Sequence, residues 1–290
     1  MTKCLIVIPA RLKATRLPNK PLAMIGDAPM IVQVWRRAVE SGVGEVVVAC
    51  DGPEIYAAIT EHGGRAFITD PELPSGSDRI WEVVKLLEGG LTPPSPAVQA
   101  TPAASGSRRF GATHELLAGG LTPPSQPAAA TPAALTGLAG HYDIIINLQG
   151  DVPTLEPRLL KALLKPLENH AVDIATLAAP ITRPEEHVSP AVVKAVLAEN
   201  GRALYFSRAA VPANDGPRYH HIGVYAYRRD ALAKFVSLPP SPLEQREKLE
   251  QLRALEAGMR IDAVVVDTVP LGVDTAEDLE RARELLANNG

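Results

Sequence analysis

The chain has 290 residues, of which 46% are hydrophobic and 21% are charged. This composition is typical of a folded globular protein and excludes a wholly disordered chain. The 29 basic and 33 acidic residues give a net charge of −4, which does not favour binding to nucleic acid or to a membrane surface. The longest apolar runs, such as 143–148 and 263–266, are far shorter than the ~20 residues of a membrane helix, so we expect no membrane span.

The N-terminal sequence MTKCLIVIPARLK has an apolar run of only five residues before Pro9, which is too short for the central region of a signal peptide. We therefore expect a cytoplasmic protein. Cys4 and Cys50 lie in separate apolar, strand-like runs without the spacing of metal ligands. Both are expected to be inert core residues, with no disulfide framework and no zinc site.

A proline-rich segment interrupts the chain. The sequence contains 27 prolines, about twice the usual share, and eight of them lie between Gly89 and Gly140. Residues 86–104 recur as 116–134 with 14 of 19 positions identical, so this segment contains a tandem duplication. Repeated prolines remove the backbone donors that helices and sheets need. We therefore expect an exposed, mostly disordered insertion over 89–140 within a single domain formed by 1–88 and 141–290.

Outside the insertion, short β-branched runs alternate with helical patterns, which is typical of βαβ units around a mainly parallel sheet with helices on both faces. In chain order, the expected strands are 3–8, 45–50, 65–68, 142–148, 173–177 and 261–266. The expected helices are 29–41, 53–62, 77–87, 156–167, 242–256 and 275–287. Between 192 and 227 the sequence has strand-like stretches with no long helix, so we expect an antiparallel excursion at about 190–228. Such appendages often form subunit interfaces, and we therefore expect a homodimer.

The loop after the first expected strand carries the first chemical signal. In IPARLKATRLPNKPL, the cations Arg11, Arg16 and Lys20 follow the carboxyl end of the strand, where open α/β sheets bind their ligands. Guanidinium and ammonium groups pair with phosphate oxygens, so this loop is a candidate site for a polyphosphate. A solvated basic loop fits the spacing equally well, because the GxxxxGK[ST] pattern of a P-loop is missing.

Two aspartates are candidate metal ligands. In IIINLQGDVP, Asp151 follows a buried strand, and the glycine before it permits close approach to a nucleotide phosphate that carries magnesium. The alternative is an aspartate that only begins a turn. In GVDTAEDLE, Asp274 lies between a strand and a helix. Thr275 and Asp278 can form a capping box, which leaves Asp274 free to be a second metal ligand.

A set of motifs extends over almost all the chain outside the insertion: IPARLKATRLPNKPL, SGSDR, NLQGDVP, AVVKAVLAENGRALYFSRAAVP, HHIGVYAYR, SPLEQREKLEQLRAL and GVDTAEDLE. Together they resemble the 3-deoxy-manno-octulosonate cytidylyltransferase family. The opening loop is shared with other sugar nucleotidyltransferases, whereas ALYFSRA, IGVYAYR and SPLE are more discriminating. The resemblance implies a Rossmann-like nucleotidyltransferase fold. It also implies transfer of CMP from CTP to the anomeric hydroxyl of 3-deoxy-manno-octulosonate (Kdo), with release of pyrophosphate, for lipopolysaccharide biosynthesis.

The resemblance further implies a catalytic set. Arg11, Arg16 and Lys20 would bind the triphosphate of CTP. Asp151 and Asp274 would hold Mg²⁺, which neutralises charge at the α-phosphate and lowers the pKa of the attacking hydroxyl, so that no separate strong base is needed.

A second motif, PSGSDR, is implied to bind the base and ribose of CTP through Ser75, Gly76 and Arg79. In the structural alternative, Ser77 is the N-cap of the following helix and Asp78 lies in its first turn.

The residues implied to bind Kdo are Gln149, Arg208, His221, Tyr225 and Glu244. Arg208 is the candidate for the sugar carboxylate, Gln149 orients the sugar or the metal-bound oxygens, and the others bind hydroxyls. Structural alternatives exist for three of them. Glu244 has the capping-box spacing to Ser241, His221 fits a hydrogen-bonded strand histidine, and Tyr225 fits a core residue.

The sequence departs from the family pattern outside the insertion as well. Val152 replaces an acidic residue after Asp151, which bears on Mg²⁺ affinity, and His220 replaces an arginine, which bears on sugar specificity. Three other functions are considered: CMP activation of a related acidic sugar, such as 8-amino Kdo or a nonulosonic acid, nucleotidyl transfer with another base, and binding of CTP without turnover. A pure binding module needs no pair of metal ligands, so Asp151 and Asp274 argue against the last.

Overall fold

The computed structural model describes residues 2–12, 17–89, 138, 140–214 and 216–287. Arg16 and nearly all of the expected insertion, whose disorder we predict from the sequence, lie outside the described residues. None of the helices within those ranges is long and apolar enough to cross a membrane.

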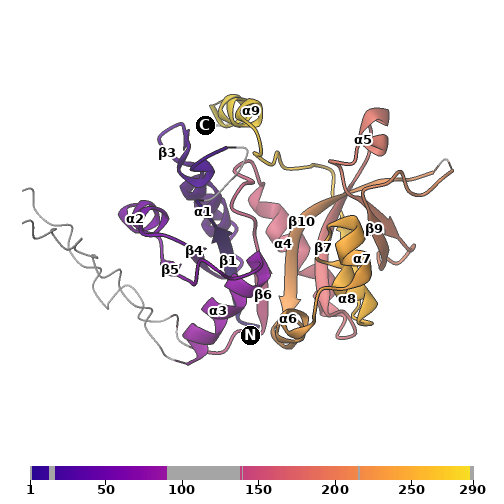
Figure 1. Ribbon diagram of the computed structural model, residues 1–290, viewed down its shortest axis with the longest axis horizontal. Helices are drawn as coiled ribbons and strands as arrows, with labels where there is room; N and C mark the ends of the chain where they lie inside the picture. Colours follow the sequence, from indigo (N-terminus) through magenta and orange to yellow (C-terminus); the bar gives the residue numbers. More distant parts are fainter. Residues whose placement is uncertain (1, 13–16, 90–137, 139, 215, 288–290) are drawn as a thin grey trace, which may run out of the picture.

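Within the described ranges, a nine-stranded sheet organises the molecule (Figure 1). Its order is β11-β7-β10-β6-β1-β4-β5, and β8 and β9 join it through β10. The strands of this sheet are β1 (Cys4–Ala10), β4 (Glu45–Cys50), β5 (Ala66–Ile68), β6 (Ile144–Asn147), β7 (Ile174–Pro180), β8 (Lys194–Leu197), β9 (Ala203–Ser207), β10 (Tyr219–Arg228) and β11 (Ile261–Val265). A separate short pair is formed by β2 (Met24–Ile25) and β3 (Ala28–Pro29).

The helices connect and cover these strands. The α-helices are α1 (Met30–Glu40), α2 (Pro53–Glu61), α3 (Gly76–Glu88), α4 (Pro157–Leu163), α5 (Pro184–Val188), α6 (Arg229–Ser237), α7 (Pro242–Glu247), α8 (Leu252–Glu256) and α9 (Ala276–Ala287). Short 3-10 helices lie at η1 (Lys20–Leu22) and η3 (Lys165–Glu168).

Two helices that the sequence predicts as continuous are divided. The helix expected over 156–167 ends as α4 at Leu163 and continues only as η3, because Pro166 has no backbone N–H to donate and its ring opposes an α-helical turn. The helix expected over 242–256 divides at Lys248, which has a left-handed backbone with φ of 58° and closes α7. The sequence analysis did not predict α6.

The α/β fold is confirmed, with parallel pairing of β1 with β4 and β6, of β4 with β5, and of β7 with β11. The antiparallel segment differs from a simple appendage. Its last strand, β10, pairs antiparallel with β6 on one side and β7 on the other, so it lies inside the main sheet. Only β8 and β9 extend beyond it.

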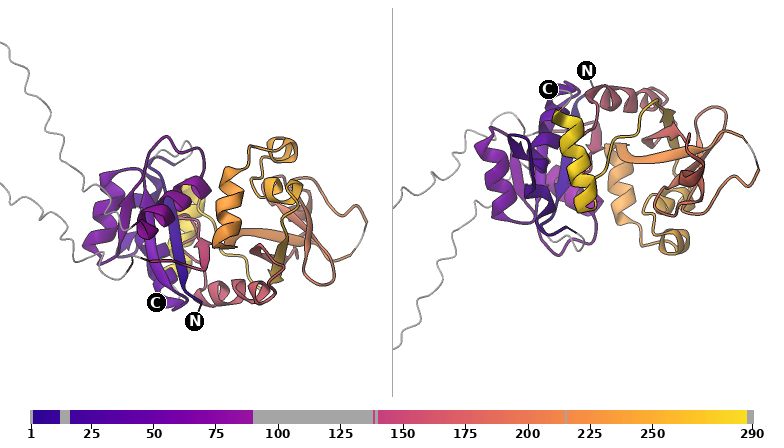
Figure 2. Two further views of the ribbon diagram at one scale, coloured as in Figure 1. Left: turned by 90° about the horizontal axis from the view of Figure 1, so that it is seen from below. Right: turned by 90° about the horizontal axis from the view of Figure 1, so that it is seen from above.

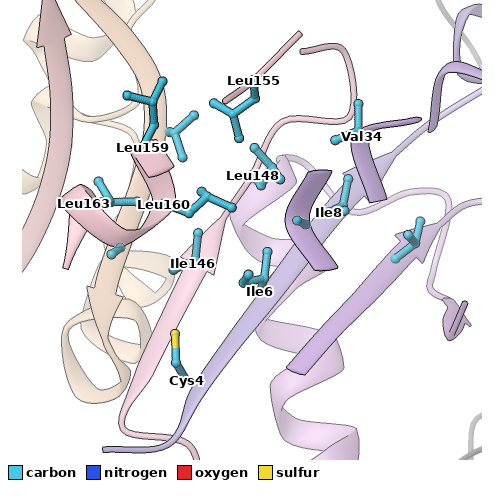
Figure 3. Packing of buried hydrophobic residues seen from close by; sticks show 14 of the residues in the cluster. Cys4, Ile6, Ile8, Val34, Ile146, Leu148, Leu155, Leu159, Leu160 and Leu163 are labelled. Atoms are coloured by element: carbon cyan, nitrogen blue, oxygen red, sulfur yellow. The ribbon is translucent and has the colours of Figure 1, made fainter. Parts of the chain in front are cut away.

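Both faces of β1 are buried, as its continuous apolar run predicts. Ile6 and Ile8 belong to a cluster with side chains of α1, α2 and α4, and Figure 3 shows the leucines of α4 over the end of β6. Leu5 and Val7 belong to a second cluster with α3, α6 and α8. Cys4 and Cys50 are free and buried, and burial raises the pKa of both thiols to about 12, which confirms the prediction of inert core cysteines.

The insertion expected over 89–140 extends too far at its C-terminal end. Leu138 is fully buried in the second cluster, and its carbonyl accepts a hydrogen bond of 2.7 Å from the Tyr142 hydroxyl. The N–H of Gly140 also donates to the carbonyl of Leu87. The folded domain therefore already includes Leu138.

The end of the chain returns to its beginning. After β11, the segment 266–275 crosses to the N-terminal half, where α9 lies against the region of β2 (Figure 2). Val273, Leu279 and Ala282 are buried with Ile25 and Met30. This crossing brings the GVD segment to the loops that follow β1 and β6.

Candidate active site

The site begins at adjacent strand ends. β1 and β6 run in parallel with Val7 opposite Asn147, so the loops that follow them leave the same edge of the sheet. Gly150 allows these loops to approach each other. A Cβ at this position would lie 3.0 Å from the Pro9 carbonyl oxygen and 3.1 Å from Ile31 Cδ1. The approach places the next residue, Asp151, against the loop of Lys20.

Lys20 joins the two predicted metal ligands. Its Nζ donates hydrogen bonds of 2.8 Å to Asp151 Oδ2 and 3.0 Å to Asp274 Oδ1. A third bond of 2.8 Å goes to the Val273 carbonyl oxygen. The backbone between the aspartates is also tied together, because the N–H of Val273 donates to the carbonyl of Asp151. Three segments that are distant in sequence therefore converge on one ammonium group.

Asp274 is left free by the cap of α9. The N–H of Asp278 donates to Thr275 Oγ1, and the Thr275 N–H and hydroxyl both donate to Asp278 Oδ2. This reciprocal arrangement is the capping box that the sequence predicts. Asp278 thus satisfies the start of the helix, and the carboxylate of Asp274 points to Lys20 instead.

The electrostatics of this cluster favour a cation between the carboxylates. Although burial lowers the pKa of the Lys20 ammonium, its hydrogen bonds and attraction to Asp151 and Asp274 outweigh that effect and raise the pKa above its ordinary value. Mg²⁺ prefers oxygen ligands and is commonly held by one or two carboxylates together with phosphate oxygens. Two carboxylates within 3.0 Å of one cationic atom fit that donor set.

The PSGS loop lies beside the end of β1. Arg11 Nη2 donates 2.8 Å to the carbonyl of Leu73, just before the loop, and a Cβ at Gly76 would contact Pro9 Cγ at 3.5 Å. Ser75 is the N-cap of α3, because its hydroxyl accepts from the N–H of Asp78. The capping alternative considered for Ser77 is therefore wrong, since the helix begins at Gly76, one residue before Ser77.

Arg79 is a fully buried cation with free donors. Its Nη1 donates to Thr69 Oγ1, whereas Nε and Nη2 have no hydrogen-bond partner in the part of the chain that the structure describes. Burial first, and the positive charge of Arg11 second, lower the pKa of the Arg79 guanidinium. A buried cation with unused donors, next to the positive charge of Arg11, favours a ligand rich in acceptors.

Three of the predicted sugar-binding residues lie around β10. Tyr225 is opposite Asn147 of β6, and Gln149 Nε2 donates 2.9 Å to the Asn147 Oδ1. The rings of His221 and Tyr225 have centroids 5.5 Å apart. Burial lowers the pKa of His221 to about 3 and raises that of Tyr225 well above its usual value, so both side chains are neutral at physiological pH.

Arg208 is held at the end of β9. Its backbone N–H donates to Glu247 Oε2 at 2.9 Å, and its Nε donates to the Glu247 carbonyl at 3.0 Å. The buried Lys194 donates to the carbonyls of Arg208, Ser189 and Val192. The Nη1 of Arg208 also donates 3.0 Å to the Pro190 carbonyl, so both the backbone and the guanidinium group of Arg208 are held in place. Glu247 and Lys194 were not predicted, because their roles depend on pairing between distant segments.

Glu244 is engaged in structural contacts. It forms a capping box with Ser241, and its carboxylate receives bonds of 2.6 and 2.8 Å from Arg253. The geometry therefore corresponds to the structural alternative for Glu244 rather than to a free sugar ligand, because both carboxylate oxygens are already bound.

Glu250 and Gln251 are candidate site residues that the sequence analysis missed. Glu250 Oε2 accepts 3.1 Å from the Ser77 hydroxyl, and burial raises the pKa of its carboxyl. Its Oε1 and the Gln251 Nε2 are buried without partners among the described residues. Glu250 lines a cavity of about 540 Å³ together with Ser75. Glu250 and Gln251 both lie in the LEQLR stretch (249–253) of the SPLEQREKLEQLRAL motif, so the family resemblance could have pointed to them. The sequence pattern instead placed them in the helix expected over 242–256.

The structure thus arranges the predicted residues in two groups. Lys20, Asp151 and Asp274 form one, and the side chains around β10 form the other. Arg11 lies apart from both and donates to the carbonyl of Leu73, beside the PSGS loop. Across the described ranges, no hydrogen bond joins Arg208 or His221 directly to the aspartate pair. Glu250 contacts Ser77 on α3, the helix that follows the PSGS loop.

The mixed α/β sheet carries a basic loop, a capped PSGS turn and two converging carboxylates at its strand ends. This combination is typical of a nucleotidyltransferase. A family model described as "Cytidylyltransferase" matches residues 5–92 and 131–261. The chain belongs to this cytidylyltransferase family. The model leaves residues 93–130 unmatched, which corresponds to most of the expected insertion.

Named relatives narrow the family further. The chain is 51% identical to a 3-deoxy-manno-octulosonate cytidylyltransferase of Paramagnetospirillum magneticum, over 97% of both chains. It is 50% identical to the protein of the same name from Methylobacterium sp., over 99% of this chain and 98% of the relative.

Solved structures of cytidylyltransferases share the fold of this chain. The structure of a CMP:2-keto-3-deoxy-manno-octonic acid synthetase complexed with CTP matches with a TM-score of 0.78 and 35% identity over 100% of both chains. A cytidylyltransferase from Leptospira borgpetersenii shares the fold, with a TM-score of 0.56 and 16% identity over 99% of this chain and 88% of its own. The Rossmann-like nucleotidyltransferase fold implied by the motifs is confirmed.

Proposed function

We propose that this chain transfers CMP from CTP to the anomeric hydroxyl of Kdo and releases pyrophosphate. The observation that carries the proposal is the convergence of Asp151 and Asp274 on Lys20 Nζ at the edge of the sheet. The names of the relatives, at about half identity over nearly the whole chain, support the choice of CTP and Kdo.

The nucleotide would lie between the loop after β1 and the PSGS turn. Arg11, Arg16 and Lys20 supply positive charge for the triphosphate. Arg79 supplies two buried N–H groups, and cytosine presents two acceptors, N3 and O2, on its pairing edge. The donor set of the pocket therefore matches the acceptors of the base.

Asp151 and Asp274 are the residues that would hold Mg²⁺. When bound there with the nucleotide, the ion would neutralise charge on the α-phosphate and lower the pKa of the attacking hydroxyl. Lys20 would then be released to donate to phosphate oxygens. Val152, which replaces an acidic residue, packs partly buried against the first core cluster and offers the ion no oxygen ligand from its side chain.

The sugar would lie beside β10. Arg208 provides the positive charge for its carboxylate, and Gln149, His221 and Tyr225 provide neutral hydrogen-bonding groups. We place Glu250 in this group instead of Glu244, because Glu250 has an unpaired buried oxygen and Glu244 has none.

We also propose a cytoplasmic homodimer. Val188 of α5 and Leu204 of β9 are 68% and 56% exposed, and both lie on or next to the segment that extends from the sheet. Burying such side chains against a second copy would remove apolar area from water.

The test is a pyrophosphate-release assay with CTP, Mg²⁺ and a panel of acidic sugars: Kdo, 8-amino Kdo and a nonulosonic acid. Preferential turnover of Kdo supports the proposal. Turnover of another sugar alone would assign the related activity instead. Binding of CTP without release of pyrophosphate with any sugar would contradict a catalytic function. The Asp27→Asn variant, whose residue pairs with Arg36 on the surface, is the matched control.

A further inference from the structure

Thr176 makes an unusual set of contacts in the centre of the sheet. It is fully buried on β7, and its Oγ1 lies 3.0 Å from His221 Nε2 on β10. The same oxygen lies 2.9 Å from the Val224 carbonyl and 3.2 Å from the Ile222 carbonyl. None of these contacts belongs to the regular ladder between the two strands.

The contacts coincide with a break in register. Ile222 pairs with Leu177, but the next paired residue on β10 is Tyr225, which pairs with Thr176. Two residues of β10 therefore have no counterpart on β7, which is a bulge. Bulges commonly redirect side chains next to active sites. The Thr176 hydroxyl lies at the bulge, within hydrogen-bond distance of the Val224 and Ile222 carbonyls.

The hydrogen-bond network assigns the tautomer of His221. A threonine hydroxyl has one hydrogen to donate, and carbonyl oxygens only accept. The Thr176 hydroxyl has its donor contacts with the carbonyls of Val224 and Ile222, and these use its one hydrogen. A lone pair of Oγ1 then accepts from His221, so Nε2 of the imidazole carries the proton. If Nε2 were unprotonated, three acceptors would surround one hydrogen, and two of them would be unsatisfied in a buried site.

This tautomer makes Nδ1 of His221 an acceptor. Nδ1 has no hydrogen-bond partner among the described residues, and the ring is held between Phe206 and Tyr225, at centroid distances of 4.7 and 5.5 Å. The strongly lowered pKa of His221 keeps the ring neutral. A neutral ring with its acceptor free is suited to a hydroxyl group that donates.

We propose that Thr176 is a positioning residue that holds His221 in the Nε2–H tautomer, so that Nδ1 accepts a hydrogen bond from a hydroxyl of the sugar substrate. The sugar contact rests on the proposed function, whereas the tautomer does not. Thr176 itself touches no substrate and acts through the imidazole and the bulge.

The first experiment measures the tautomer directly. In the ¹⁵N-labelled wild-type protein, long-range ¹H–¹⁵N correlations of His221 should show a protonated Nε2 and an unprotonated Nδ1. A proton on Nδ1 in the wild-type protein would overturn the inference. This measurement needs no substitution, so it decides the question even if a variant fails to fold.

The second experiment uses Thr176→Val and Thr176→Ser. Serine keeps the hydroxyl and should retain the tautomer, whereas valine removes it and should yield a mixture. Because only the Nε2–H form can accept from the sugar, Thr176→Val should raise the KM for Kdo in proportion to the loss of that form, about tenfold if one tenth of it remains, and leave the KM for CTP nearly unchanged. Thr60→Val removes a threonine hydroxyl that bonds only to carbonyls of its own helix, and is the matched control.

The outcomes separate the two ideas. An unchanged tautomer in Thr176→Val would overturn the role of Thr176. Equal increases in the KM for Kdo and the KM for CTP would also overturn it. A changed tautomer with an unchanged KM for Kdo would uphold the tautomer assignment and overturn the sugar contact of His221, which belongs to the proposed function.

Discussion

Lys20 and Asp274 are 254 residues apart in the chain, and the Lys20 ammonium donates a hydrogen bond of 3.0 Å to the Asp274 carboxylate. The same ammonium lies 2.8 Å from Asp151. One ammonium group therefore offsets part of the negative charge of a carboxylate pair that, with nucleotide bound, would bind Mg²⁺. Exchange of one cation for the other would move Lys20 toward the phosphates.

Asp151→Asn and Asp274→Asn should each lower kcat by at least about a hundredfold, because each removes a proposed ligand of the Mg²⁺ ion, which would contribute several kcal/mol at the phosphorus centre. The fold should be retained, since the amide has the shape of the carboxylate and can still accept from Lys20. Turnover at saturating Mg²⁺ and the thermal midpoint should be measured beside Asp27→Asn. Near-normal turnover by either variant would remove that residue from the metal site.

Removal of residues 93–130 should preserve both turnover and the thermal midpoint. These residues lie outside the family match, and closing a shorter loop changes the entropy only logarithmically with length. In contrast, Leu138→Ala should lower the free energy of unfolding by roughly 2 to 4 kcal/mol, because it opens a cavity in the core. Thermal and urea denaturation compare the two variants. Loss of folded protein on removing 93–130 would show that the insertion is structural.

CTP should be preferred over UTP by at least ~2 kcal/mol, because a site that accepts from the amino group of cytosine would face a carbonyl oxygen of uracil and leave a buried group unpaired. The ratio of kcat/KM for the two nucleotides gives this value directly. Equal kcat/KM values for CTP and UTP would show that the site does not read the amino group of cytosine.

Arg208→Ala should raise the KM for Kdo much more than the KM for CTP, because the sugar carboxylate loses a charge-assisted partner while Arg11 and Lys20 keep their contacts with the triphosphate. Initial rates with each substrate varied in turn measure both constants. The control is Arg246→Ala, which removes an exposed arginine from α7. Similar increases in both constants would assign Arg208 a structural role.

Glu244→Gln should lower the free energy of unfolding by roughly 1 to 3 kcal/mol at neutral pH, because it removes the charge that pairs with the buried Arg253. Burial raises the pKa of Glu244, but the bonds from Arg253 and Ser241 outweigh burial and hold it below the ordinary 4.5. The stabilisation is therefore fully present above pH 4.5 and is lost as the pH falls through the lower, folded-state pKa. Urea denaturation of both proteins from pH 7 to pH 3 should show the difference disappearing, with the KM for Kdo unchanged at pH 7. A raised KM would restore Glu244 to the sugar site.

Features that depend on neighbouring residues were predictable from the sequence alone. The continuous apolar run of β1 indicated a strand buried on both faces, because each face needs its own set of side chains. The capping boxes at Thr275 and Ser241 followed from a spacing of three residues, within reach of one helical turn. The motifs also identified the family and most of the candidate site residues.

Other features depended on the tertiary structure. The path of 266–275 across the molecule brings Asp274 to Lys20, and no local pattern encodes that path. Contacts between segments distant in sequence likewise determine three other features. These are the position of β10 inside the sheet, the burial of Leu138 and the ion pair of Arg253 with Glu244. Local propensity sets backbone conformation over a few residues, whereas these contacts form only because burying both faces of the sheet selects one arrangement of the whole chain.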